Sequence, residues 1–163
     1  MQLQNPLWAF ALKVYSHSEV EQCCLVLQND FGMSVNRLLF AGWLALQHKS
    51  LNLPALEQSQ ANAWQKDMTH PLRALRYQLR PLHKETPELT KLYQMMRKAE
   101  LEAEKIELAH LYALANHWPV ISISVDVIMR ENIACLAASS GRSTDVVQQD
   151  LLTSLSRHMM LLG

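Results

Sequence analysis

The chain has 163 residues, of which 49% are hydrophobic and 18% charged, and its formal net charge is zero. This length suits one domain with a sizeable core, and the composition excludes a largely disordered chain. Because basic and acidic side chains balance, no overall field attracts nucleic acid or anionic lipid, and any such binding needs a local patch.

The first two predicted helices begin at recognisable caps. Asn5 followed by Pro6 places a capping side chain and a first-turn proline where helices start, which predicts a helix over residues 6–15. Ser18 begins a capping-box pattern, which predicts a second helix over residues 19–30. Because only a short turn separates this helix from the next helical segment, we expect the two to pack as a hairpin.

The central segment, residues 35–47, is the most apolar part of the chain. Ten of the twelve residues from position 35 to position 46 are apolar or glycine, and only Asn36 and Arg37 are polar. A helix that is apolar on all sides is normally a buried one, and Ser34 can cap its first turn. We therefore predict a core helix in which Trp43 is almost fully buried.

The middle of the chain predicts three further helices. Residues 55–67 read as a thinly amphipathic helix. Pro71 is typical of a first turn and predicts a new helix with leucines on one stripe and arginines on the neighbouring stripe. The longest helix is expected over residues 86–116, because neither proline nor glycine interrupts it after its first turn.

The C-terminal third predicts a connector and two helices. Residues 120–125, VISISV, alternate apolar residues with serine, but no partner strand is evident, so we expect an extended connector. Asp126 caps a helix that ends at Gly141. Ser143 or Thr144 opens a last helix, whose apolar stripe is expected to pack on the long helix. The alternative is that part of this stripe docks a second copy or another protein.

Charge is distributed unevenly along the chain. Residues 71–98 carry seven basic and two acidic side chains, whereas residues 99–163 carry four and eight. The arginines share one helical face and the glutamates another, so two antiparallel helices would join them in an ion-pair network, with Arg76 the most buried arginine. The alternatives are an outward-facing site for phosphate or an acidic partner, and a plain solvated face. The candidates are Arg73, Arg76, Arg80, Glu100, Glu104 and Glu107.

Asn36 adds a polar group beside the apolar run. Its amide is expected to bond to neighbouring backbone in the core, as buried amides normally do. The alternative is that Asn36 orients a ligand in a pocket bounded by Trp8, Trp43, Arg76 and Glu104.

Signatures of metal or cofactor chemistry are weak. Glu107 and His110 form one E-x-x-H pattern, but a di-iron bundle needs a second such pattern and two further glutamates, so we expect no metal. Phosphate-cradling glycine loops and nucleophile elbows are absent, so we expect no cofactor and assign no catalytic residue. The chain has three cysteines, and we interpret them as structural thiols. They are Cys23, Cys24 and Cys135.

Four short motifs carry a family resemblance. They are NPLWAFALKVY at residues 5–15, VNRLLFAGW at 35–43, PLRALR at 71–76 and AELEAE at 99–104. With these motifs, the first two thirds of the chain resemble a family of small proteobacterial proteins catalogued as a domain of unknown function. The resemblance implies a bacterial, cytosolic, helical protein and carries over no activity, cofactor or catalytic residue.

These observations predict a single all-α domain over residues 1–163, with about seven helices around the buried central helix. No run of about 18 apolar residues occurs and the first residues lack a secretory pattern, so we expect a cytoplasmic protein without a membrane segment. The favoured function is a non-enzymatic protein-interaction or adaptor role, with the C-terminal helix as a candidate partner surface. The alternatives are a small-ligand binder or helical enzyme using the Asn36, arginine and glutamate cluster, and an RNA or ribosome-surface binder using residues 73–98.

Overall fold

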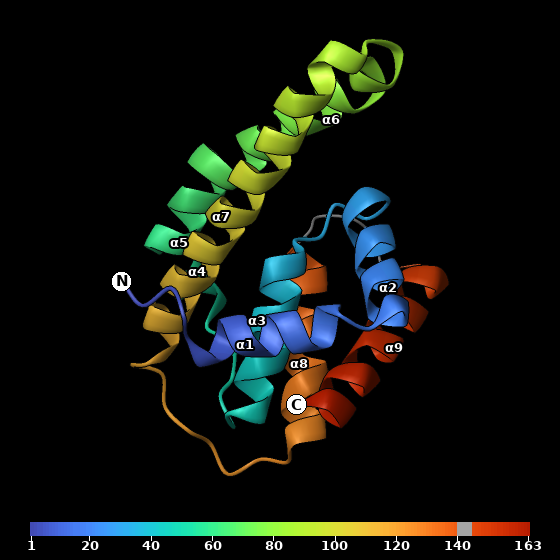
Figure 1. Cartoon of the computed structure of the whole chain (residues 1–163). Helices are drawn as coiled ribbons and strands as arrows, with labels where there is room; N and C mark the ends of the chain where they lie inside the picture. Colours follow the sequence, from blue (N-terminus) through green and yellow to red (C-terminus); the bar gives the residue numbers. More distant parts are fainter. Residues whose placement is uncertain (140–144) are drawn as a thin grey trace.

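The computed structural model describes residues 1–139 and 145–163, and their regular structure is entirely helical (Figure 1). The predicted all-α class is therefore confirmed. The predicted helix end at Gly141 and the helix start at Ser143 or Thr144 lie outside the described residues. The helices are α1 (Pro6–Tyr15), α2 (Ser18–Asn29), α3 (Val35–Leu46), α4 (Leu53–Glu57), α5 (Gln60–Trp64), α6 (His70–Glu85), α7 (Thr90–Ala115), α8 (Val125–Ser139) and α9 (Val146–Leu162).

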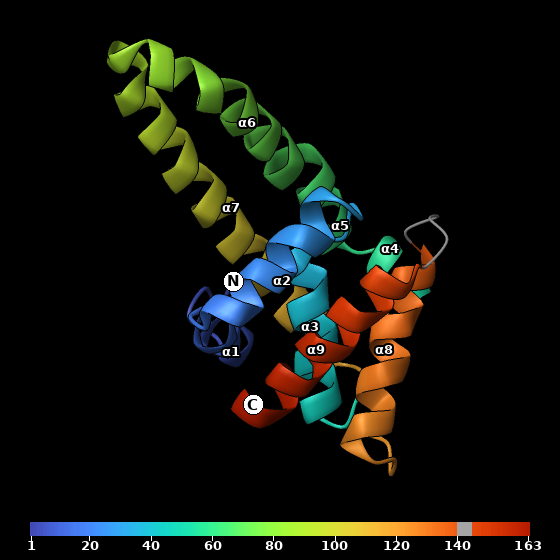
Figure 2. The same ribbon diagram turned by 90° about the vertical axis from the view of Figure 1, so that its right-hand side faces the viewer.

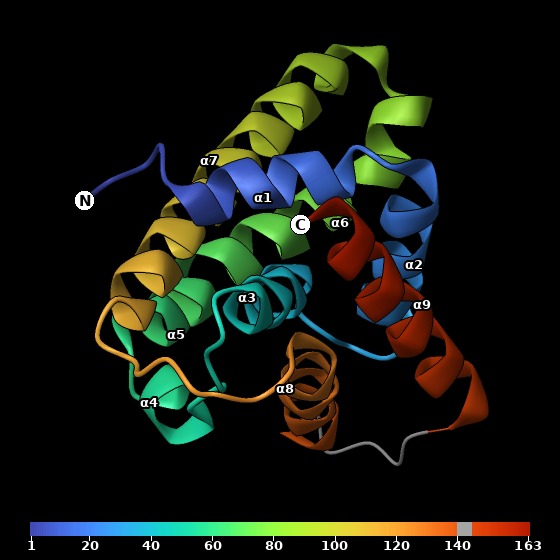
Figure 3. The same ribbon diagram turned by 90° about the horizontal axis from the view of Figure 1, so that it is seen from below.

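The central helix of the fold is α3, as the sequence predicts. Ser34 caps it by accepting a hydrogen bond from the backbone N–H of Arg37, and Leu38, Phe40 and Leu44 are fully enclosed. Figure 3 shows α1, α7, α8 and α9 arranged around this helix. The Trp43 side chain is only 7% exposed, which confirms its predicted burial. Helix α2 was expected to pack on α3 as a hairpin. In the structure it contacts α9 more extensively than α3.

Two helices project from this body as an arm, which we define as residues 71–98. The arm contains most of α6, the connecting turn and the first part of α7, and Figures 1 and 2 show it extending away from the other helices. No residue of α6 is buried. The leucine stripe predicted on this helix therefore does not enter the core: the side chains of Leu75 and Leu82 are 48% and 47% exposed.

A π-helical segment, Gln65–Thr69, joins α5 directly to α6. The sequence predicted one helix over residues 55–67 and a new start beside Pro71, so this prediction is wrong. Proline lacks a backbone N–H and its ring crowds the preceding helical turn, and a wider π turn can relieve that crowding. In the structure the N–H of His70 bonds to the carbonyl of Gln65, five residues back, and the helix continues through Pro71.

Several helix ends differ from the predicted ones by a few residues. Ser18 lies inside α2 and His17 occupies the cap position without a side-chain hydrogen bond, so the predicted capping box is absent. The start of α9 is capped by Asp145, whose side chain accepts from the N–H of Gln148. Residues 116–124 form no helix or strand, in agreement with the expected connector.

The C-terminal helix α9 packs on α1, α2, α3 and α8 rather than on the long helix α7. Its side chains Leu155 and Met159 are completely buried. Gly42 of α3 permits this approach, because a Cβ atom at that position would overlap the sulfur of Met159. The expected packing partner was therefore wrong, although the stripe is largely covered within the chain.

Candidate functional site

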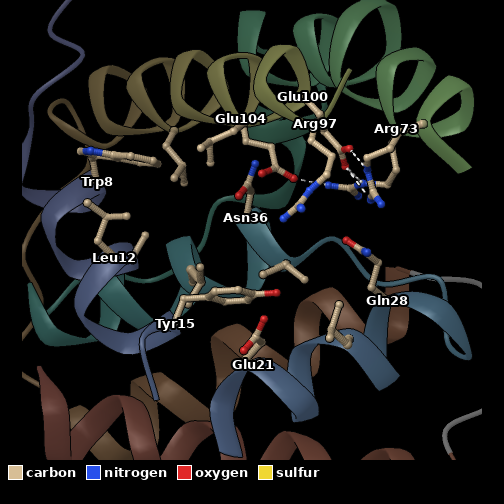
Figure 4. Close-up of a pocket in the computed structure, with 17 residues that line it drawn as sticks. Trp8, Leu12, Tyr15, Glu21, Gln28, Asn36, Arg73, Arg97, Glu100 and Glu104 are labelled. Carbon is tan, nitrogen blue, oxygen red and sulfur yellow. Dashed lines mark hydrogen bonds and ion pairs between the residues drawn. The ribbon is translucent and has the colours of Figure 1, made fainter. Parts of the chain in front are cut away.

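A cavity of about 350 Å³ lies where the arm meets the body. Helices α1, α2 and α3 form one side of it, and α6 and α7 form the other. We call this cavity the crevice (Figure 4). It collects five of the seven candidate site residues, from three helices: Asn36, Arg73, Arg76, Glu100 and Glu104.

An ion-pair network joins α6 to α7 along one wall of the crevice. Arg73 donates from Nε to Oε1 of Glu100 at 2.9 Å and from Nη2 to Oε1 of Glu104 at 2.5 Å. Arg76 donates from Nε to Oε2 of Glu100 and from Nη2 to Oε1 of the same carboxylate. Both oxygens of Glu100 are therefore occupied, as in the predicted network.

The network shifts the proton affinities of its members. Burial would raise the pKa of Glu100, but the hydrogen bonds and charges of Arg76 and Arg73 outweigh it and lower that pKa. Hydrogen bonding to Glu100 raises the pKa of Arg76. Burial raises the pKa of Glu104, for which Arg73 is the only bonded cation among the described residues. Glu100 is thus held as a carboxylate, and Glu104 is the more easily protonated of the two.

The burial order of the arginines differs from the predicted one. The Arg73 side chain is 14% exposed and the Arg76 side chain 17%, so Arg76 is not the most buried arginine. The expectation failed because the leucines next to Arg76 do not enter the core: Leu75 is exposed, and Leu72 and Leu79 are only half-buried. Arg80 lies farther out on α6, is exposed and does not line the crevice.

Arg97 is a crevice residue that the sequence reasoning missed. Its side chain extends from α7 toward the cavity (Figure 4), and no ion pair or hydrogen bond joins it to another residue within 1–139 and 145–163. A signal was available in the sequence: Arg97, Glu100, Glu104 and Leu108 are spaced by three or four residues and so share one face of a helix.

The opposite wall of the crevice is apolar and aromatic. Asn5 caps α1 by accepting from the N–H of Trp8 at 2.9 Å, and the next turns of α1 place Leu12 and Tyr15 on the same wall. The exposed hydrophobic side chain of Leu12 stands at the opening. Burial, with a smaller contribution from nearby acidic groups, raises the pKa of Tyr15 to about 12, so its phenol remains a hydrogen-bond donor at neutral pH.

A deeper polar cluster lies behind Asn36. The carboxyl group of Glu107 is almost completely buried, and its Oε1 accepts from Nε2 of Gln65 at 2.8 Å. Burial raises the pKa of Glu107, although the side chains of Thr69, Asn36 and Gln65 oppose this shift. Glu107 therefore does not face the arginine stripe. The prediction that it belongs to the arginine and glutamate cluster is wrong, because its side chain lies in the core.

Trp43 also lies outside the crevice, contrary to the pocket proposed for Asn36. Its ring stacks on Phe40 with centroids 6.5 Å apart and contacts Tyr112 in the core. Trp8 does line the crevice, as expected. The difference arises because Trp43 contacts Tyr112 in the core, whereas Trp8 lies on α1 at the end of the crevice away from Arg73 (Figure 4).

A second cavity of about 360 Å³ continues from the crevice and shares Gln28 and Arg73 with it. Between α2 and α6, the hydroxyl of Tyr77 accepts from Gln28 and donates to Asn29. These bonds are exposed, and they connect the arm to the body beside the crevice.

The described residues contain no group of three or more histidine, cysteine, aspartate or glutamate side chains that could hold a metal ion. The ring of His110, from the E-x-x-H pattern, packs against Trp64 at a tilt of 45°, with ring centroids 6.0 Å apart. In the part of the chain that the structure describes, no helix combines the length and the apolar character that crossing a membrane requires.

Comparison with known proteins identifies a family but no activity. No curated protein and no solved structure matches the chain. A family model described as "Protein of unknown function (DUF2390)" matches residues 6–111, which include α1 to α6 and most of α7. Every side chain that lines the crevice falls within this match. The chain therefore belongs to the DUF2390 family of proteins of unknown function.

Proposed function

We propose that the protein binds a small amphipathic molecule in the crevice. The observation that carries this proposal is the meeting of an apolar wall and a charged wall across one cavity of about 350 Å³. Ligand sites are typically concave, mostly apolar and supplied with a few convergent polar groups. The crevice has this composition, with Trp8 and Leu12 on one side and the arginines of α6 and α7 on the other.

A purely structural role for the ion pairs explains less of the geometry. Arg73 and Arg76 do tie the arm together through Glu100. That role requires neither the space beside the network nor the half-exposed side chain of Leu12 facing it. Ligand binding accounts for both features, since a bound apolar group would cover Leu12 and Trp8.

The test uses the neutral fluorophore phenylnaphthylamine, whose emission rises in apolar surroundings. We expect the wild-type protein to bind it and Leu12→Trp to abolish binding, because the larger ring fills the mouth of the crevice. The matched control is Leu161→Trp, since Leu161 is an exposed leucine on α9 outside the crevice. Equal binding by the two variants, or no binding by the wild type, would contradict the proposal.

A protein-interaction or adaptor function is the second candidate, favoured by the surface of the arm. Five large apolar side chains are exposed there beside a strong excess of basic residues. Exposed apolar clusters among charged residues mark interaction surfaces, and a basic surface selects an acidic partner. We propose that the arm would bind an acidic amphipathic helix of another protein. The apolar residues are Leu75, Tyr77, Leu82, Leu92 and Met95.

A labelled helical peptide of alternating leucine and glutamate patches tests this second function. Leu82→Glu should weaken its binding to the protein, because a like charge replaces an apolar contact on the arm. Val147→Glu is the control and also tests the predicted partner surface on α9, where Leu152, Leu155 and Met159 are already buried and Val147 is exposed. If only Val147→Glu abolishes peptide binding, the partner surface lies on α9 instead of the arm. If the protein binds single-stranded RNA more tightly than the peptide, and added salt weakens that binding, the nucleic-acid alternative is favoured.

We infer a cytoplasmic and non-enzymatic protein as the setting for either function. The support for the location is the resemblance carried by the four sequence motifs, which implies a bacterial cytosolic protein. Fractionation of cells that express the tagged chain tests the location.

A further inference from the structure

We propose that the ligand of the crevice is an organic anion, with a carboxylate, sulfonate or phosphate group anchored by Arg97. This inference rests on the proposed ligand-binding function and adds the chemical class of the ligand. An oxyanion on an apolar body would place its charge against α7 and its body against α1.

Among the described residues that line the crevice, the ion pairs leave one guanidinium available. Arg73 and Arg76 share the carboxylate of Glu100, and Arg73 also binds Glu104. Arg97 forms no ion pair or hydrogen bond with the rest of the described chain, yet it points into the same cavity (Figure 4). A guanidinium offers a planar set of donors that matches the oxygens of a carboxylate or phosphate.

The other polar groups of the crevice fit the same ligand. The phenol of Tyr15 keeps its proton at neutral pH and can donate a hydrogen bond. Figure 4 shows the side chains of Tyr15 and Arg97 directed at the central space, and Asn36 lines the same cavity next to Glu104. Glu21 lies on α2, across the cavity from Arg97, so its charge directs an anion toward α7.

The apolar part of the ligand has its own wall. Trp8, Leu12 and Leu39 line the side of the crevice away from the ion pairs. An inorganic anion would leave this wall uncovered, whereas an aromatic or branched aliphatic body would cover it. The structure therefore favours an organic anion over phosphate alone.

The experiment compares two probes that differ by one charge, phenylnaphthylamine and its sulfonated relative anilinonaphthalene sulfonate. Arg97→Gln should weaken binding of the sulfonate about tenfold or more, as expected when a charge-assisted hydrogen bond is lost. Binding of the neutral probe should not change. Lys98→Gln is the matched control, because Lys98 is the next residue on α7, exposed and outside the crevice. Circular dichroism of each variant checks that the fold is retained.

The outcomes separate this inference from the function on which it rests. If Leu12→Trp blocks both probes but Arg97→Gln weakens neither, the ligand site stands and the anion inference is overturned. If neither probe binds, the proposed function itself fails. A second measurement on the wild type is independent of any variant: added salt should weaken the sulfonate and not the neutral probe. Displacement of the bound sulfonate by naphthoate or by naphthyl phosphate then ranks carboxylate against phosphate, and displacement by neither overturns the inference.

Discussion

The guanidinium of Arg73 on α6 and the carboxylate of Glu100 on α7 meet at 2.9 Å, although they are 27 positions apart in the chain. Their side chains are 14% and 7% exposed. The contact closes the base of the arm and forms one wall of the crevice at the same time. The proposed ligand site and a structural joint therefore share the same charged groups.

A double-mutant cycle measures this joint. We expect Arg73→Met and Glu100→Gln to show a coupling free energy of about 1 to 3 kcal/mol in urea unfolding, because the two groups are close and largely excluded from water. The control cycle pairs Arg80→Met with Glu100→Gln, since Arg80 shares the arginine stripe but is exposed and does not line the crevice. Coupling of the same size in both cycles would mean that the direct contact between Arg73 and Glu100 does not account for the stability of the arm.

Trp43 tests the central position of α3. Trp43→Ala should lower the free energy of unfolding by about 3 to 5 kcal/mol, because it removes a large buried side chain and leaves a cavity. The ring is in contact with Phe40 and Tyr112, so little collapse can fill the space. Chemical denaturation followed by circular dichroism provides the number. A solvated-indole emission from Trp43 in the native protein, or an unchanged stability, would contradict this placement.

Ionisation of the buried carboxyl group of Glu107 should lower the free energy of unfolding as pH rises. Burial raises its pKa above the ordinary value of 4.5, so the native state retains a proton that the unfolded chain releases. The native state then loses stability from about pH 4.5 upward, until the pKa of the folded state is passed. Glu107→Gln is neutral at every pH and should gain stability relative to the wild type over this range.

Urea titrations between about pH 5 and about pH 8 check this difference. Glu102→Gln on the exposed face of α7 is the control, and its stability relative to the wild type should stay flat by comparison. A flat difference for Glu107→Gln would show that its carboxyl group is ionised in the folded protein at all of these pH values.

Asn132 holds the connection after α3 in place. Its Oδ1 accepts from the N–H of Leu51 at 2.7 Å, and its Nδ2 donates to the carbonyls of Ala41 and Lys49. Asn132→Leu should cost about 2 kcal/mol or more, because buried backbone groups lose their partners. Thermal unfolding compares it with Glu131→Leu, an exposed neighbour on α8. Equal melting temperatures would refute the assigned role.

Gly42 and Met159 test the docking of α9 on α3. Gly42→Val should destabilise the protein by about 1 to 3 kcal/mol, since overpacking forces the two helices apart. Met159→Ala in the same chain should recover part of this loss by making room for the new side chain. If the second change adds its own full cost instead, the two positions are not in contact and α9 lies elsewhere.

Local patterns in the sequence determined the helices of the body. The Asn5–Pro6 start of α1 and the apolar run of α3 act within a few residues, so capping and burial can be inferred without knowing the fold. The arginine and glutamate stripes were also recognisable, because helical spacing places each set on one face. Their pairing followed from the short turn between the two helices, which makes them antiparallel.

Tertiary structure decided the site. Asn36 and Arg73 belong to the same crevice because α3 lies at the base of the arm, and no pattern along the chain encodes that distance. Arg97 became a candidate only because the structure shows its neighbours Arg73 and Arg76 in ion pairs with glutamates, whereas Arg97 has no such pair within the described residues. The depth of Glu107 depends equally on which helix covers its face of α7. Periodicity identifies the face of a helix, but burial and an empty space beside it depend on the other helices, and these are set by the packing of the whole chain.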